Sequence, residues 1–538
     1  MKKKITSVLA LILVIASILM AIIVTATGTA TVATFWALVP PIIAIALALL
    51  TKEVYSSLFL GIVVGSILAC NSSVTTAVDH VVSDGLIAAI SDTAGIFLFL
   101  VILGILVALI NKSGGSAAFG RWAQTHIKTR IGAQFATFVL GVLIFIDDYF
   151  NCLTVGSVML PVTDSHKISR AKLSYLIDAT AAPICMIAPI SSWAAAVAEY
   201  ADGTGFNGIQ LFVKAIPYNF YSLLTFVFII FLVLSKKDFG PMAKHEQNAI
   251  EKGDLFSTEE RVDGITTEHN PKGQVADLLL PILVLIGLSV FALIYNGGFF
   301  DAASSYYGDF IGAFSATTAS TALPWGALVA MILVVIYLVA RKLITFKDAM
   351  DCIPKGFIAM VPAIIILTFA TSLKNITSGL LQSDEFIKVV MDSGLKNFTS
   401  LLPAIIFVVA CLLAFATGTS WGTFGILIPI VYNMFDPSNP IFYIGMSACL
   451  AGAVCGDHCS PISDTTIMSS AGAQCVHVNH VSTQLPYAIT VAVISFICFL
   501  VAGFVTNPII CLLLGTVLIA GFFFLLTILS KRKESIRR

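Results

Sequence analysis

Two polar segments with a shared Pro-Ile-Ser core interrupt an otherwise apolar sequence. Residues 188–192 read Ala-Pro-Ile-Ser-Ser, and residues 456–466 read Gly-Asp-His-Cys-Ser-Pro-Ile-Ser-Asp-Thr-Thr. A proline inside a helix removes a backbone hydrogen bond and frees peptide carbonyl and amide groups. Na+ is a hard cation and prefers carbonyl, hydroxyl and carboxylate oxygens. The two segments therefore predict paired helix breaks that bind a cation.

Five aspartates fall within or beside stretches that are expected to cross a membrane, namely Asp147, Asp148, Asp178, Asp457 and Asp464. An ionised carboxylate at the centre of a span costs about 2.5–3.5 kcal/mol on insertion scales, so each is a candidate for function. The alternative interpretation is that some of them only cap a helix end, and Asp178 fits either interpretation. Because neighbours on a helix diverge by roughly 100°, only one of Asp147 and Asp148 is expected to face a site.

Two further segments are rich in hydroxyl groups and glycine. Residues 151–162 and 419–431 are too short to cross a bilayer alone, and we predict that they are the returning arms of hairpins. Helix packing through small residues is the alternative interpretation, which we assign to residues 61–65. The candidate ion- and substrate-binding residues from the arms, the breaks and the aspartates are Asp147, Asp148, Asn151, Asp178, Ser191, Ser192, Thr419, Ser420, Asp457, Ser460, Ser463, Asp464 and Thr465, of which Asp457, Ser463 and Asp464 are the expected Na+ ligands.

The elements that must position these residues are transmembrane helices. Of the 538 residues, 58% are hydrophobic and 11% are charged, whereas a soluble domain carries about 25% charged residues. Most apolar runs have about 16 to 22 residues, which is long enough to cross a hydrocarbon core of roughly 30 Å. We predict an all-α polytopic membrane protein of about 14 spans, and an outer-membrane barrel is excluded because it needs short alternating strands. Residues 2–24 resemble a signal peptide, but the many following spans favour an uncleaved first helix.

The basic residues predict the orientation. If residues 2–4 lie in the cytoplasm, the basic loops at 112–130, 167–172 and 341–347 lie there too, and the segments 71–93 and 296–323, which contain no Lys or Arg, lie outside. Both termini are therefore expected to be cytoplasmic, with the chain embedded in the lipid of the cell membrane. The 30 Lys and Arg residues balance 30 Asp and Glu residues, so no global field indicates a nucleic-acid partner.

The two halves of the chain carry similar landmarks in the same order. Ala-Pro-Ile-Ser in the first half matches Ser-Pro-Ile-Ser in the second, and two earlier landmarks also match. In the predicted orientation, equivalent spans run in opposite directions, which is the inverted repeat typical of secondary transporters. The predicted parts are an extra first span (1–30), a first repeat (31–234), a cytoplasmic linker (235–274), a second, inverted repeat (275–506) and a last span with a basic tail (507–538). The linker is expected to be a solvated tether.

Several other kinds of chemistry are disfavoured by the sequence. Cys455, His458 and Cys459 match no standard zinc spacing, and a second set, Cys475, His477 and His480, is placed in a predicted loop. The 11 cysteines are interpreted as reduced core residues. The sequence has neither a phosphate-binding Gly-x-x-x-x-Gly-Lys-Ser/Thr loop nor a His-Glu-x-x-His motif. We therefore expect no enzyme activity and no cofactor, with an ion gradient as the energy source.

Residues 456–466, supported by residues 145–151 and 188–193, resemble the NhaC family of Na+/H+ antiporters within the ion transporter superfamily. The resemblance covers nearly the whole chain. It implies a duplicated, inverted architecture with hairpins that enter from opposite sides of the membrane. It leaves the substrate open, because relatives include exchangers that couple Na+ and H+ to small carboxylates such as malate and lactate.

The expected function is Na+/H+ exchange by competition, in which a buried carboxylate binds either H+ or Na+ while the protein alternates access. Asp457→Asn or Asp464→Asn is expected to abolish Na+-dependent proton flux, whereas replacing a nearby serine with alanine is expected to raise the apparent KM for Na+. The alternative function is a Na+- or H+-coupled carrier of a small organic anion or an amino acid. The repeat disfavours a channel or a membrane-embedded enzyme, and a homodimer is a possible assembly.

Overall fold

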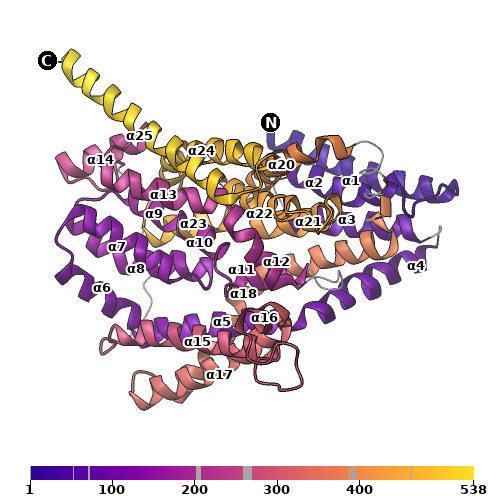
Figure 1. The fold of residues 1–538 in the computed structure, drawn as a ribbon, viewed down its shortest axis with the longest axis horizontal. Coiled ribbons are helices and arrows are strands. Elements are labelled where there is room, and N and C mark those ends of the chain that lie inside the picture. Colours follow the sequence, from indigo (N-terminus) through magenta and orange to yellow (C-terminus); the bar gives the residue numbers. More distant parts are fainter. Residues whose placement is uncertain are drawn as a thin grey trace.

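The computed structural model describes residues 2–51, 54–70, 73–200, 207–258, 270–383, 385–386, 389, 395–461 and 463–537. Within these residues every regular element is helical, and most long helices run along the horizontal axis of Figure 1. This confirms an all-α polytopic membrane protein. The first elements are α1 (Lys2–Ala26), α2 (Val39–Thr51), α3 (Val54–Ala69), α4 (Val74–Asp79), α5 (Ala88–Ser113) and α6 (Gly115–His126).

Seven described helices are long and apolar enough to cross a membrane, or nine if each bent pair of helices is one span. The predicted count of about 14 is therefore not confirmed. Four shorter apolar helices of 10–17 residues are also present among the described residues. The seven helices are Val74–Ser113, Ala276–Asn296, Ser320–Ala340, Phe398–Phe415, Ile441–Cys459, His477–Ala502 and Pro508–Leu529.

The first half contains a helical hairpin followed by a broken helix. The hairpin consists of α7 (Arg130–Leu143) and α8 (Asp148–Ser165), which pack against each other. The broken helix consists of α9 (Arg170–Asp178), α10 (Ala182–Cys185) and α11 (Ser192–Glu199). The half ends with α12 (Gly208–Ala215) and α13 (Phe220–Ser235).

The second half repeats this order of elements. α20 (Leu402–Thr417) packs against α21 (Ser420–Met434), and α22 (Ile441–Cys459) is separated from α23 (Asp464–Gly472) by a break. The two predicted short arms are therefore α8 and α21, and each lies next to the broken helix of its own half. Before them come α15 (Ala276–Asn296), α16 (Phe310–Ala316), α17 (Ala319–Ala340) and α18 (Phe346–Lys374).

Glycines allow helices from different halves to approach closely. A Cβ atom added to Gly104 on α5 would lie 2.3 Å from the carbonyl oxygen of Gly356 on α18, and one added to Gly156 on α8 would lie 2.5 Å from the carbonyl carbon of Gly472 on α23. Small residues permit this close packing in membrane proteins, where burial of apolar surface does not drive helices together. The contact between α8 and α23 places the first hairpin beside the second broken helix.

The linker between the halves is more ordered than the predicted tether. It contains α14 (Gly240–Lys252), which packs against α9 and α24 and lies at the left edge of Figure 1. Glu246 of α14 is buried, pairs with Arg130 and accepts a hydrogen bond from the Ser169 amide at 2.8 Å. Glu246 can be buried because its charge has a partner. The number of charged residues in the linker did not reveal this pairing.

The last two long helices are α24 (His477–Ala502) and α25 (Pro508–Arg537), and α25 extends beyond the body at the upper left of Figure 1. The sequence predicts a span at 486–505 preceded by a loop with Cys475, His477 and His480. The loop assignment is wrong for the two histidines, because α24 begins at His477. His480, Thr483 and Gln484 in the first turns of α24 are polar but buried in protein.

Candidate functional site

Four helix breaks form the candidate site, and a proline or a glycine lies at three of them. Pro183 and Pro189 lie in the broken helix of the first half, and Pro461 lies in that of the second half. Each lacks an amide hydrogen and cannot continue a helical hydrogen-bond ladder. In the second hairpin, Gly418 adopts a left-handed conformation with φ of 70°, which is easy only for glycine and ends α20.

Three of the predicted hydroxyl residues cap the helices that begin at these breaks. Ser191 accepts a hydrogen bond from the Ala194 amide at 3.0 Å, and Ser463 accepts one from the Thr466 amide at 3.3 Å. Thr419 caps α21 in the same way. The serines of the two Pro-Ile-Ser segments thus have equivalent capping roles and hold the broken geometry.

Three buried aspartates lie near one another, at or close to helix breaks. Asp147 ends the break of the first hairpin, Asp148 begins α8, and Asp457 lies in the last turn of α22. They are only 1%, 1% and 4% exposed. Asp148 is close enough to both Asp147 and Asp457 for the charges to repel one another. Ser420, the first residue of α21, donates a hydrogen bond to Asp457 Oδ2 at 2.8 Å. We call Asp147, Asp148 and Asp457 the acidic trio.

The prediction that only one of Asp147 and Asp148 turns inward rested on their sharing a helix. Asp147 instead lies in the break, outside the helix that Asp148 begins, so the helical 100° separation does not apply and both side chains are buried. The Ser192 amide donates to the Ile146 carbonyl oxygen at 2.9 Å. This bond joins the hairpin break to the start of α11.

Asn151 connects the first hairpin to the first broken helix. Its Nδ2 atom lies 2.7 Å from the carbonyl oxygen of Gly141, 2.9 Å from that of Ile144 and 3.0 Å from that of Thr180. In the second half, Ser460 Oγ donates to the Phe415 carbonyl oxygen at 2.8 Å, which joins the other broken helix to the other hairpin. Carbonyl groups exposed by the breaks are thus bonded by side chains from the partner element.

Some buried oxygens at this junction have no hydrogen-bond partner among the described residues. They are Asp148 Oδ1, Asn151 Oδ1 and Ser192 Oγ. Buried polar atoms of native proteins are normally satisfied by protein, water or an ion. Carboxylate, amide and hydroxyl oxygens are the ligands that a hard cation prefers.

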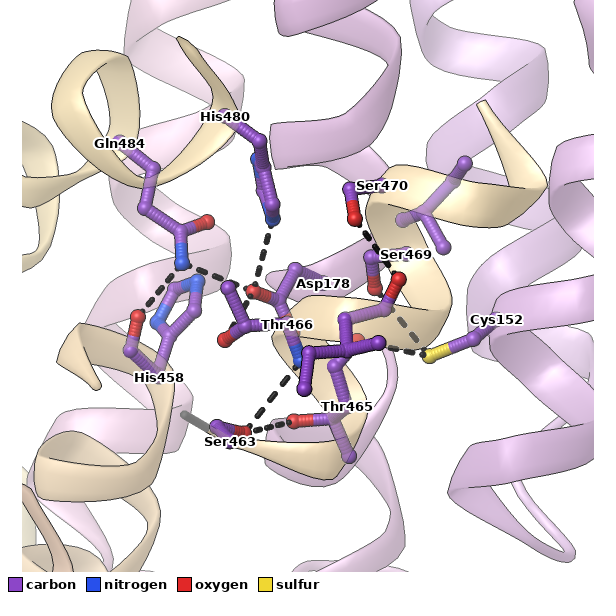
Figure 2. Close-up of polar contacts among 12 residues, drawn as sticks. Cys152, Asp178, His458, Ser463, Thr465, Thr466, Ser469, Ser470, His480 and Gln484 are labelled. Carbon is purple, nitrogen blue, oxygen red and sulfur yellow. Dashed lines mark hydrogen bonds and ion pairs between the residues drawn. The ribbon is translucent and has the colours of Figure 1, made fainter. Parts of the chain in front are cut away.

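Asp178 lies in a second polar cluster, shown in Figure 2. Its Oδ2 atom accepts hydrogen bonds from Thr466 Oγ1 at 3.0 Å and from Gln484 Nε2 at 2.8 Å, and it lies 3.1 Å from His480 Nε2. The Gln484 amide also donates to the carbonyl oxygen of His458 at 2.6 Å. Asp178 on α9 is therefore joined to α22, α23 and α24.

The remaining predicted residues lie around α23. Ser463 and Thr465 are buried and their hydroxyl oxygens are 3.0 Å apart. Asp464 begins α23, but its side chain lies outside the described part of the chain. Cys152 of α8 contacts this helix, with its Sγ atom 3.2 Å from Ser469 Oγ.

His480 and Gln484 were missed as site residues by the sequence reasoning. The available signal was their spacing, since residues four apart lie on one helix face, just before Pro486 in an apolar run. Extending the predicted span toward the N-terminus would have placed both on that face. Their partner Asp178 is separated by about 300 residues in sequence, so the contact itself had no local signal.

Paired hairpins, broken helices and a buried acidic junction define a secondary transporter, the class in which discontinuous helices build an ion site between structural repeats. The model of the Na+/H+ antiporter family matches residues 184–504. The chain belongs to this family, which confirms the resemblance found in the sequence.

Proteins similar to the chain include two relatives and one solved structure. An uncharacterized protein of Haemophilus influenzae is 39% identical over 482 residues, which cover 87% of this chain and 91% of the relative. The malate-2H+/Na+-lactate antiporter of Bacillus subtilis is 27% identical over 161 residues, covering 30% of this chain and 34% of that protein. The YdaH transporter of Alcanivorax borkumensis has 13% identity and a TM-score of 0.53, covers 79% of this chain and 88% of its own, and supports the fold alone.

Proposed function

We propose that this transporter exchanges Na+ for H+ across the cell membrane, with Na+ bound at the acidic trio. The observation that carries the proposal is the convergence of Asp147, Asp148 and Asp457 where the helix breaks meet. Three carboxylates in one buried place repel one another, so the group gains stability from a cation or from protons. Binding of Na+ and binding of H+ therefore oppose each other.

Neighbouring oxygens complete the proposed Na+ site. Ser420 Oγ lies beside Asp457, and the unpartnered oxygens of Asp148, Asn151 and Ser192 lie on the adjoining segments. Two buried basic side chains, Arg170 and Lys172, are paired with Asp164 and Asp238. Both ion pairs involve carboxylates outside the trio.

A second candidate function is Na+- or H+-coupled exchange of a small organic anion. The similarity to the malate-2H+/Na+-lactate antiporter favours it. The helices α11, α21 and α23 begin at the breaks, and amide groups at such helix starts can hold a carboxylate. In this function the trio would bind only the coupling ion.

Transport in proteoliposomes tests the proposal. Full-length protein is reconstituted with an internal pH dye and given Na+ alone, or Na+ with a panel of organic acids. Alkalinisation or acidification driven by Na+ alone, lost in Asp457→Asn and Asp148→Asn, is the expected result. Proton movement that requires an organic acid would favour the second candidate, and wild-type flux in both variants would contradict the role of the trio.

A further inference from the structure

A second group able to bind a proton lies outside the acidic trio, where Asp178 meets His480. Asp178 is 1% exposed and His480 is fully buried. The two side chains come from opposite halves of the chain, on α9 and α24, and Figure 2 shows the imidazole directed at the carboxylate. The proposed Na+/H+ exchange uses neither residue.

Hydrogen bonding determines which ring nitrogen of His480 can take a proton. Asp178 Oδ2 is approached by a hydroxyl of Thr466, an amide of Gln484 and Nε2 of His480. A carboxylate that receives several donors carries its charge and can only accept. His480 Nε2 must therefore carry the hydrogen, which leaves the lone pair on Nδ1.

His480 Nδ1 is buried and has no hydrogen-bond partner among the described residues. A proton that binds there converts the imidazole to an imidazolium whose charge is balanced by Asp178 at 3.1 Å. Protonation changes the charge of the pair from −1 to zero. The same arrangement, a carboxylate that orients a histidine for proton transfer, is used in acid–base catalysis.

Other titratable groups lie around the pair. His458 and Cys459 on α22, Tyr175 on α9 and Cys152 on α8 interact electrostatically with Asp178. His458 Nδ1 lies 2.7 Å from the hydroxyl of Tyr221 on α13, and the Tyr175 ring stacks on the His458 ring. The cysteines and the tyrosine are neutral in their ordinary states. His458, like His480, is an imidazole that can accept a proton.

The side-chain amide of Gln484 connects the pair to the helix that carries Asp457. Gln484 Nε2 has two hydrogens and two acceptors, Asp178 Oδ2 and the carbonyl oxygen of His458, and His458 follows Asp457 directly. A change in charge at Asp178 and His480 therefore alters a bond that holds the end of α22, where Asp457 lies. The structure thus provides a physical connection between two ionisable sites.

We propose that His480, oriented by Asp178, binds a proton that is carried in each transport cycle in addition to the proton that Na+ displaces from the acidic trio. This inference rests on the proposed Na+/H+ exchange. It predicts that more than one proton moves per Na+, so that transport is electrogenic and responds to membrane potential.

The test measures radioactive Na+ and H+ fluxes together in proteoliposomes at a series of pH values. His480→Gln keeps an amide donor for Asp178 but cannot titrate. We expect it to keep coupled exchange of Na+ and H+ but to carry one proton fewer per Na+ and to lose the voltage response. Asp178→Asn should have the same effect, and Asp178→Glu should restore part of the lost proton.

His80→Gln is the matched control, because His80 Nδ1 lies 2.6 Å from Asp84 Oδ2 in an equivalent but exposed pair. It should leave the H+ to Na+ ratio unchanged. A wild-type ratio and pH profile in His480→Gln would overturn the inference. If that variant does not fold, an H+ to Na+ ratio of one in the wild-type protein at every pH would also overturn the inference. Failure of wild type to move protons with Na+ would instead contradict the proposed function.

Discussion

At the scale of single residues, the breaks use similar side chains for two different tasks. Ser191 and Ser463 cap helices and hold the backbone, whereas Ser420 bonds directly to the carboxylate of Asp457. A cap contributes about 1 kcal/mol to helix stability, and a hydrogen bond to a charged group contributes about 1.5–3 kcal/mol. Substitution of the two kinds of serine should therefore have different effects on folding and on ion binding.

Ser420→Ala is expected to raise the apparent KM for Na+ by about tenfold with little change in maximal rate, because the lost bond orients Asp457 and supplies a neighbouring oxygen. The measurement is Na+-dependent proton flux over a range of Na+ concentrations. Ser66→Ala is a matched control, since buried Ser66 donates only to the Ile62 carbonyl of its own helix. An unchanged KM in Ser420→Ala would remove this serine from the proposed site.

At the scale of elements, the polar Pro-Ile-Ser segments predicted where two helices break, whereas proline alone did not, because Pro161 and Pro429 lie inside α8 and α21. Pro189 and Pro461 lie at breaks in the structure, and the predicted arms are α8 and α21. The contacts between elements could not be predicted, because Asp178 and His480 are brought together only by the packing of α9 against α24. Hydropathy also assigned the first turns of α24 to a loop, since it does not distinguish solvent-facing polarity from polarity buried in protein.

The linker helix α14 provides a test of electrostatics outside the spans. Burial, followed by the charge of Asp238, raises the pKa of Glu246, while Lys172, Arg130 and the Ser169 amide oppose this. A carboxyl group whose pKa is raised by docking contributes stability below its undocked pKa, and that contribution is lost as pH rises through the docked pKa. Packing of α14 against α9 and α24 is therefore expected to weaken as pH rises.

Hydrogen–deuterium exchange of α14, measured across this pH range and corrected for the intrinsic exchange rate, checks the prediction. Glu246→Gln should make its protection independent of pH, because the amide is uncharged and can still accept the Ser169 hydrogen bond. Glu246→Ala should reduce protection at all pH values by about 1–3 kcal/mol, since it leaves the Ser169 amide unbonded. Protection of wild-type α14 that increases with pH would contradict the assigned direction.

At the scale of the whole molecule, the two halves share an order of elements and exchange contacts. The first hairpin packs on the second broken helix through Gly156 and Gly472, and Trp193 of the first broken helix packs on Trp421 of the second hairpin, with ring centroids 5.9 Å apart. Each half therefore contributes contacts to the other. The repeat was sufficient to infer a site between the halves, but the individual contacts between them could not be inferred from it.

The orientation derived from basic loops is tested by fusions to the full-length chain. Fluorescent protein placed before residue 1 or after Arg538 should fluoresce, and alkaline phosphatase at the same positions should be inactive, because both ends are predicted to be cytoplasmic. Fusions within the segment 296–323, which contains no Lys or Arg, should show the opposite behaviour. Active phosphatase at either end would reverse the predicted topology.

The amide of Asn151 has a consequence that follows from counting hydrogens. Its nitrogen lies within 3.0 Å of three carbonyl oxygens but carries two hydrogens. The three carbonyl oxygens must share two hydrogens, so at any instant one of them receives no hydrogen bond from Asn151. These oxygens lie at the end of α7 and just after α9, so the hydrogens of one amide are divided between the first hairpin and the first broken helix.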